Sequence, residues 1–159
     1  PGNYTAVVRG VNGGTGIGVV EVFDLSQTSA SLLGNISSRG FVDTGDNVMI
    51  GGFILGPVDR GNPRLVVRAL GPSLSSSGVS NPLQNPTLEV HDGSGTVIAS
   101  NDDWPTDPSS SFVVANGLAP SDTRESAIFT SLTPGAYTAI VRGVGNTTGV
   151  GLIEVYNLQ

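Results

Sequence analysis

The chain has no cysteine and no lysine among its 159 residues, and it has a single histidine, methionine and tryptophan. The absence of cysteine excludes disulfides, thiol catalysis and Cys-based metal sites. The absence of lysine excludes Schiff-base chemistry on a lysine amine. The lone His91 lies in a strand-like stretch, and no Gly-x-Ser-x-Gly nucleophile motif occurs. We therefore predict a protein that is not an enzyme.

Charged residues and long apolar runs are also scarce. Only 13% of the residues are charged, and the net charge is −6. An acidic chain is a poor partner for nucleic acid or for an anionic membrane surface. No apolar run is long enough to span a bilayer, so we expect no membrane insertion. The chain starts at Pro1 without an initiator Met or a signal segment, which predicts a mature or excised segment.

Glycine, with 23 residues, is abundant, as are valine, isoleucine, threonine and serine. Short β-branched runs bounded by Gly, Pro and Asn are typical of strands and turns. We predict an all-β fold, a jelly-roll-like β-sandwich of about nine to ten short antiparallel strands, with an additional N-terminal β-hairpin. The adjacent Gly51 and Gly52 inside one expected strand suggest a bulge or a close backbone approach.

One segment occurs twice, as PGNYTAVVRGVNGGTGIGVVEVFDL at residues 1–25 and as PGAYTAIVRGVGNTTGVGLIEVYNL at residues 134–158. A shift of 133 residues aligns the two copies, with 15 of 25 positions identical. Each copy is predicted to be a hairpin. Arg9 and Glu21 recur as Arg142 and Glu154, and each pair could form a cross-strand ion pair within its hairpin.

The repeat divides the chain into an N-terminal hairpin, residues 1–27, and a β-sandwich domain, residues 28–159. In one interpretation the parent is a tandem array with a period near 133 residues, so that this chain is one period plus the closing hairpin of the previous one. In the other, the hairpin adds to a neighbouring subunit by donor-strand complementation and builds a head-to-tail filament or surface array. The partners are then copies of the chain itself or adjacent repeats. The predicted subunit contacts are Tyr4, Val7, Arg9, Val11, Val19, Val20, Glu21, Val22 and Phe23.

Further motifs resemble known bacterial modules. The segment 87–158, with DGSGTVIASNDDW and TPGAYTAIVRGV, resembles the bacterial pre-peptidase C-terminal domains, which are small β-sandwiches of secreted enzymes and surface proteins. Residues 35–54, 67–74 and 117–128 resemble a longer repeat of large secreted proteins from environmental bacteria. The resemblance implies an extracellular or cell-surface β-module and no particular activity. We therefore expect an extracellular structural subunit or repeat, with a Ca²⁺- or glycan-binding accessory module of a secreted enzyme as the alternative.

The alternative, a Ca²⁺- or glycan-binding module, depends on one acidic region. Calcium is the one cofactor that this region could bind. Oxygen ligands on loops suit Ca²⁺, although the spacing is not that of an EF-hand. The same side chains could instead cap backbone amides in solvated turns. The candidate ligands are Asp92, Asn101, Asp102 and Asp103.

The sequence also suggests one position that could bind a glycan and three that could be glycosylated. Trp104 follows the acidic residues directly and could stack on a sugar, or it could anchor the loop in the core. The sequence also has three N-x-S/T sequons that could carry a glycan, at Asn3, Asn35 and Asn146.

Overall fold

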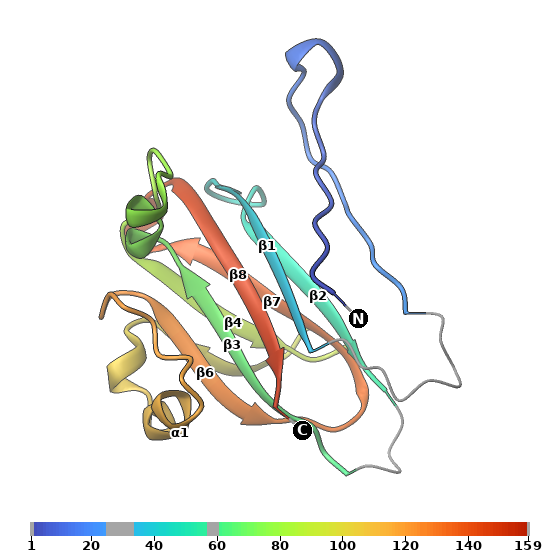
Figure 1. Cartoon of the computed structure of the whole chain (residues 1–159), viewed down its shortest axis with the longest axis vertical. Helices are drawn as coiled ribbons and strands as arrows, with labels where there is room; N and C mark the ends of the chain where they lie inside the picture. The colour runs from blue at the N-terminus through green and yellow to red at the C-terminus, as the bar shows by residue number, and fades with distance from the viewer. Residues whose placement is uncertain (1, 25–33, 57–60, 159) are drawn as a thin grey trace. The chain divides into compact units, whose positions relative to one another are not determined.

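Figure 1 shows the computed structural model of the chain, which describes residues 2–24, 34–56 and 61–158. The chain divides into two compact units, Pro1–Leu33 (unit 1) and Gly34–Gln159 (unit 2). The predicted boundary between residues 27 and 28 lies outside the described residues. No helix in the described ranges is long and apolar enough to cross a membrane.

Unit 2 is a sandwich of two four-stranded antiparallel sheets (Figure 1). Sheet A has the order β1-β8-β3-β6 and sheet B the order β2-β7-β4-β5. This order is that of a jelly roll, in which nearly every connection passes from one sheet to the other. The strands are β1 (Asn35–Val42), β2 (Met49–Leu55), β3 (Arg64–Leu70), β4 (Pro86–His91), β5 (Val97–Asn101), β6 (Ser126–Ser131), β7 (Gly135–Gly143) and β8 (Gly149–Asn157). The predicted all-β sandwich is confirmed.

The predicted count of nine to ten strands is wrong, because the described residues contain eight. Unit 1, where an additional hairpin was predicted, contributes no strand. Its residues 2–24 run out and back, drawn in blue in Figure 1, with one 3₁₀ turn, η1 (Val11–Gly13), and no strand. The apolar pattern of a strand is present in both arms, but strand structure also needs a hydrogen-bonded neighbour.

The main core lies between the two sheets and follows the alternation of the strands. On β3, Leu65, Val67 and Ala69 are fully buried, and on β7, Ala139 and Val141 are fully buried. These positions differ by two because every second side chain of a strand points to the same face.

Gly51 marks a close approach rather than a bulge. A Cβ atom at this position would lie 3.0 Å from Cδ1 of Ile153 in the opposite sheet. The register of β2 on β7 continues unbroken through Gly51 and Gly52. A shift in strand register, typical of a β-bulge, lies instead between β4 and β5 at Val90 and His91.

A second, smaller core lies under the segment that connects β5 to β6. This segment contains η4 (Trp104–Thr106) and α1 (Ser110–Ala115), and Figure 1 shows α1 beside β6. Val66, Val113 and Ala127 are fully buried there, on or against sheet A. Phe112 of α1 stacks on Phe129 of β6, with ring centroids 4.8 Å apart. One face of sheet A is therefore covered.

The predicted C-terminal hairpin is wrong, because β7 and β8 do not pair with each other. β7 lies between β2 and β4 in sheet B, and β8 lies between β1 and β3 in sheet A. The two strands are joined by the 3₁₀ turn η5 (Val144–Asn146), so the segment is an arch between the sheets. Each of the two strands pairs instead with strands from distant parts of the chain, β7 with β2 and β4, and β8 with β1 and β3.

The expected ion pair of Arg142 with Glu154 is absent for the same reason. Glu154 lies opposite Arg68 on the neighbouring strand β3. Nε of Arg68 donates to Oε2 of Glu154 at 2.9 Å, and Nη1 donates to the Leu118 carbonyl at 2.7 Å. Nη2 donates to the hydroxyl of Tyr156 at 3.1 Å, and the guanidinium lies 5.0 Å from the centre of that ring. This largely buried group ties β3 and β8 to the covering segment.

We predict that Arg68→Met destabilises the sandwich, because it leaves the Glu154 carboxylate buried without its cation. The expected loss in the free energy of unfolding is about 3 kcal/mol, measured by urea denaturation. The double variant Arg68→Met, Glu154→Leu removes both charges and should regain most of that loss. A double variant no more stable than the single one would contradict this role for the pair.

Candidate functional site

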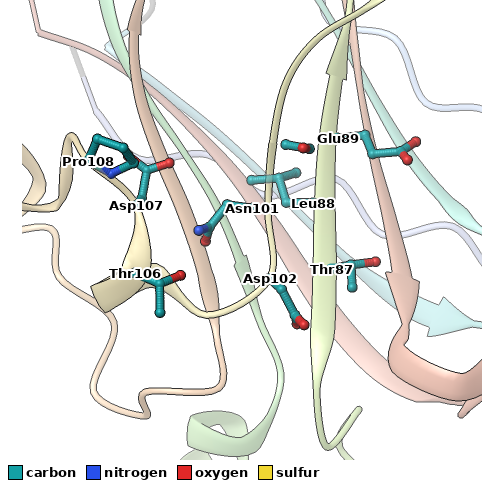
Figure 2. Close-up of a pocket in the computed structure, with 9 residues that line it drawn as sticks. Thr87, Leu88, Glu89, Asn101, Asp102, Thr106, Asp107 and Pro108 are labelled. Atoms are coloured by element: carbon teal, nitrogen blue, oxygen red, sulfur yellow. The ribbon is translucent and has the colours of Figure 1, made fainter.

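An open pocket of about 430 Å³ lies where the predicted acidic region meets β4 (Figure 2). It is formed by β4, by β5 and by the turn that follows β5. Three carboxylates line it, those of Glu89, Asp102 and Asp107. The other lining residues are Thr87, Leu88, Ser100, Asn101, Thr106 and Pro108.

The three carboxylates do not converge on one point. Figure 2 shows the carboxylate of Glu89 pointing away from those of Asp102 and Asp107. Oδ1 of Asp107 accepts hydrogen bonds from the backbone amide of Ser109 at 2.7 Å and from its hydroxyl. Burial, and then the charge of Asp103, raise the pKa of Asp102. The pocket therefore contains one carboxylate with a raised pKa, that of Asp102, and two that already have hydrogen-bond partners, those of Asp107 and Glu89.

Two of the four predicted calcium ligands have structural partners. Oδ1 of Asp92 accepts from the amides of Ser94 and Thr96, at 2.9 and 3.0 Å, and from the Ser94 hydroxyl. Those bonds, led by the one from the Ser94 side chain, lower the pKa of Asp92. Oδ1 of Asn101 accepts from the amide of Ala127 at 3.0 Å. These side chains close a turn and join β5 to β6.

The described residues contain no group of three or more His, Cys, Asp or Glu side chains placed to hold a metal ion. The structure therefore does not bring Asp92, Asn101, Asp102 and Asp103 together as a ligand set. Calcium binding stays an untested alternative interpretation of the sequence.

The predicted glycan positions differ in their surroundings. Trp104 packs against the second core, and its Nε1 is buried without a hydrogen-bond acceptor. Asn3, Asn35 and Asn146 are all exposed. Nδ2 of Asn35 donates to the carbonyl of Val155 at 3.3 Å, whereas Asn146 lies in the turn of the arch with a positive φ of 60°.

A small charged cluster lies on the outer face of sheet B. Oε2 of Glu89 lies 3.0 Å from Nε2 of His91 and accepts from Nη1 of Arg142 at 2.8 Å. Nδ1 of His91 lies 3.1 Å from the carbonyl of Gly95. That carbonyl and then Glu89 raise the pKa of His91. Burial raises the pKa of Glu89, but the bonds from His91 and Arg142 outweigh it and lower the value.

The repeated segment is the second candidate site, and its two copies have the same turn. The amide of Gly14 donates to the carbonyl of Val11 at 3.0 Å, as the amide of Thr147 donates to Val144 at 3.2 Å. Each turn has two consecutive residues with positive φ. They are Asn12 (54°) and Gly13 (74°) in unit 1, and Gly145 (62°) and Asn146 (60°) in the arch.

The glycine before each turn is required by a close backbone approach. A Cβ on Gly10 would lie 1.8 Å from the carbonyl oxygen of Gly14, and one on Gly143 would lie 2.1 Å from that of Thr147. The similarity between the two segments therefore extends from the sequence to the local backbone.

The two copies differ in the environment of their side chains. Tyr137 and Val141 of β7 are 9% and 0% exposed, and Ile153 of β8 is 2% exposed. The equivalent residues in unit 1 are largely exposed: Tyr4 is 90% exposed, Val8 is 64% exposed and Val20 is 54% exposed. Unit 1 thus has the inner-face residues of a sandwich without a buried inner face.

This alignment refines the predicted contact residues. Val7, Arg9 and Val19 correspond to Ile140, Arg142 and Leu152, which alternate with the buried positions and point away from the main core. Sequence reasoning missed Ala6 and Val8, whose equivalents Ala139 and Val141 are fully buried. The period of two that starts at Tyr4 is the signal that could have found them.

We predict that the His91 cluster stabilises the sandwich most between about pH 4.5 and 6.5. The raised pKa of His91 gives stability that is present below its ordinary value of 6.5 and is lost as the pH rises through the folded value. The lowered pKa of Glu89 gives stability that is present above 4.5 and is lost as the pH falls through the folded value. His91→Gln should therefore destabilise more at about pH 5.5 than at about pH 8.5, by less than about 1 kcal/mol, since Glu89 is partly exposed.

Urea denaturation of the parent and of His91→Gln at both pH values measures this difference. Glu89→Gln serves as the matched variant. It removes the charge that faces His91 but keeps the Gly95 carbonyl, so in this background the loss caused by His91→Gln should depend less on pH. Equal losses for His91→Gln at both pH values would contradict the assignment.

We predict that calcium and EDTA leave the melting temperature the same within about 2 °C. A specific ion at one hundred times its dissociation constant would contribute about 2.7 kcal/mol, which shifts the melting temperature of a domain of this size by several degrees. Thermal unfolding monitored by circular dichroism checks this. A rise of several degrees with Ca²⁺ that Asp102→Asn removes would instead support a calcium site at the pocket.

Comparisons with known proteins give likenesses among solved structures. No family model and no curated protein matches the chain. Among solved structures, the chain is similar to the pre-peptidase C-terminal domain of a collagenase from Bacillus anthracis. The identity is 15% and the TM-score 0.46, over 76% of this chain and 88% of that one. The motifs of residues 87–158 resemble the same family of domains.

Proposed function

We propose that this protein is a non-enzymatic, extracellular structural module that joins copies of itself end to end, with unit 1 as the connecting segment. One observation carries the proposal. Unit 1 repeats the segment β7–η5–β8 in sequence and in turn conformation, yet its inner-face residues are exposed.

The apolar surface of unit 1 provides the driving force. Nine large apolar side chains within residues 2–24 are exposed: Tyr4, Val7, Val8, Val11, Ile17, Val19, Val20, Val22 and Phe23. Burial of one such side chain contributes about 1.5–3 kcal/mol. An exposed apolar surface of this extent is typical of an interaction site.

The backbone of unit 1 supports the same proposal. Within the described residues the two arms of unit 1, residues 2–10 and 16–24, form no strand. An extended segment that adds to the edge of a sheet gains main-chain hydrogen bonds along its whole length. The copy in unit 2 makes such bonds on both sides of each strand.

The charged residues of unit 1 also have counterparts that are paired in unit 2. Arg142, the equivalent of Arg9, binds Glu89, and Glu154, the equivalent of Glu21, binds Arg68. In both cases the partner lies on a different strand of the same sheet. Charges at these positions are therefore compatible with a segment inserted beside other strands.

Association of this kind is head-to-tail. Each copy carries one donor, unit 1, and one sandwich, and the two surfaces differ. An interface between two different surfaces can add one copy after another without limit. It builds open filaments or arrays, unless the rotation between successive copies closes them into a ring. The extracellular setting follows from the resemblance of the sequence motifs to modules of secreted and surface proteins.

We predict that Val8→Asp weakens self-association by at least about tenfold, because it places an unpaired carboxylate at an inner-face position. Sedimentation velocity over a range of concentrations measures the association, and negative-stain electron microscopy shows whether filaments form.

Thr15→Asp is the matched control, since it introduces the same charge at a position whose equivalent, Thr148, is exposed in the sandwich. It should associate like the parent. A parent that stays monomeric at all accessible concentrations, or two variants that associate equally, would overturn the proposed function.

A further inference from the structure

We infer that unit 1 of one copy docks on the β1–β2 side of the sandwich of a second copy, with one arm added to each sheet. The inference rests on the proposed function and identifies its acceptor. A sandwich has two open sides, formed by the edge strands of its sheets. In unit 2 these are the side of β1 and β2 and the side of β5 and β6.

On the β5–β6 side, side chains already occupy the free edge of β6. The amide of Ala127 donates to Oδ1 of Asn101 at 3.0 Å, and the amide of Phe129 donates to Oγ of Ser109 at 3.3 Å. The ring of Phe112 covers Phe129. Because these groups occupy the free edge of β6, an added strand would have to displace them.

The β1–β2 side has no such covering within the described residues. Both of its strands also expose large apolar side chains. Phe41 of β1 is 54% exposed, and Ile50 and Ile54 of β2 are 58% and 76% exposed. Native proteins protect edge strands against pairing with charged residues, prolines or bulges, and β2, with the sequence MIGGFIL, has none of these.

The topology shows that an arch of this type fits both strands at once. β7 is antiparallel to β2 and β8 is antiparallel to β1, and one turn joins the two. A second arch in the same orientation on the free side of β1 and β2 is therefore antiparallel to both. Its inner-face residues, Tyr4 and Val8 among them, then continue the inner faces of the sheets.

The register of β7 on β2 gives the residue pairs on sheet B. Ile50 lies opposite Ile140 and Phe53 lies opposite Tyr137. Transferred to unit 1, this register places Val7 opposite Ile50 on the outer face. It also places Tyr4 opposite Phe53 on the inner face, where the equivalent Tyr137 stacks on Phe53 with ring centroids 5.6 Å apart.

On sheet A the charges are complementary. Ser37 lies opposite Glu154 in the register of β1 on β8, so Glu21 of an added arm would lie opposite Ser37 and diagonal to Arg39. Arg39 is exposed on β1. A diagonal pair on one face of a sheet is within reach of long side chains.

A different mode of association would be exchange, in which unit 1 replaces β7–η5–β8 of the acceptor. The displaced arch would lose the strand pairs and the buried surface that the incoming arch gains. Exchange therefore leaves the number of paired strands unchanged, whereas addition at β1 and β2 increases it. We infer addition for this reason.

The absence of cysteine makes disulfide trapping a clean test. A Val7→Cys variant is mixed with an Ile50→Cys variant, oxidised mildly, and examined by mass spectrometry for the mixed dimer. Opposed positions in antiparallel strands have Cβ atoms within about 5.5 Å, which suits a disulfide. Two further mixtures pair Val7→Cys with Ile98→Cys, an exposed position on β5, and with Glu89→Cys on β4.

Addition predicts that the Val7–Ile50 dimer forms at least about five times faster than the other two. Exchange places Val7 between Ile50 and Glu89, as Ile140 is now, so equal yields at those two positions would overturn the inference. A preference for Ile98 would assign the β5–β6 side instead and overturn it as well.

Sedimentation of the reduced mixtures separates this inference from the proposed function. Copies that associate while Val7 and Ile50 fail to cross-link contradict only the docking site. Copies that do not associate contradict both.

Discussion

The structure depends on the requirement that the two inner strands of each sheet be paired along both edges and buried on their inner faces. β7 and β8 meet this requirement together, one in each sheet, and a single turn joins them. They hold β2 to β4 in sheet B and β1 to β3 in sheet A. Without this arch neither sheet would be continuous, and the inner-face residues of the remaining strands would lose the buried residues of β7 and β8 as packing partners.

The same requirement explains why the copy of this segment in unit 1 is important. Its turn needs only local chemistry, namely residues that tolerate a positive φ and a glycine at the close approach, and it forms in both copies. Strand pairing and burial need other segments, and the described part of unit 1 has neither. The contrast separates what a 25-residue segment specifies alone from what it gains from a sandwich.

Much of the fold could be predicted from the sequence. The alternation of apolar residues indicated the strands of unit 2, and the turn residues around Asp92 and Gly95 indicated the β4–β5 hairpin. The arch could not be distinguished from a hairpin, because both need the same alternation and a similar turn. The assignment of β7 and β8 to different sheets depends on non-local pairing with β2, β4, β1 and β3, and the wrong partner for Glu154 followed from that.

The candidate sites were harder to predict for a similar reason. Asp92 and Asn101 are near each other in the sequence of an acidic region, but their side chains bond to backbone amides of different segments. The inner-face role of Ala6 and Val8 is indicated by the alternation that starts at Tyr4, and their buried equivalents, Ala139 and Val141, make it plain. The repeat itself was plain from the sequence, and it is the feature on which the proposed function depends.

The central claim is that residues 2–24 become paired strands when copies of the chain meet. Amide hydrogen exchange of this segment, followed by mass spectrometry over a dilution series, tests it most directly. The account predicts that residues 2–10 and 16–24 exchange rapidly in dilute protein and become protected as concentration rises, while the turn at 12–13 stays less protected. Rapid exchange of both arms at every concentration, beside a protected sandwich, would contradict it.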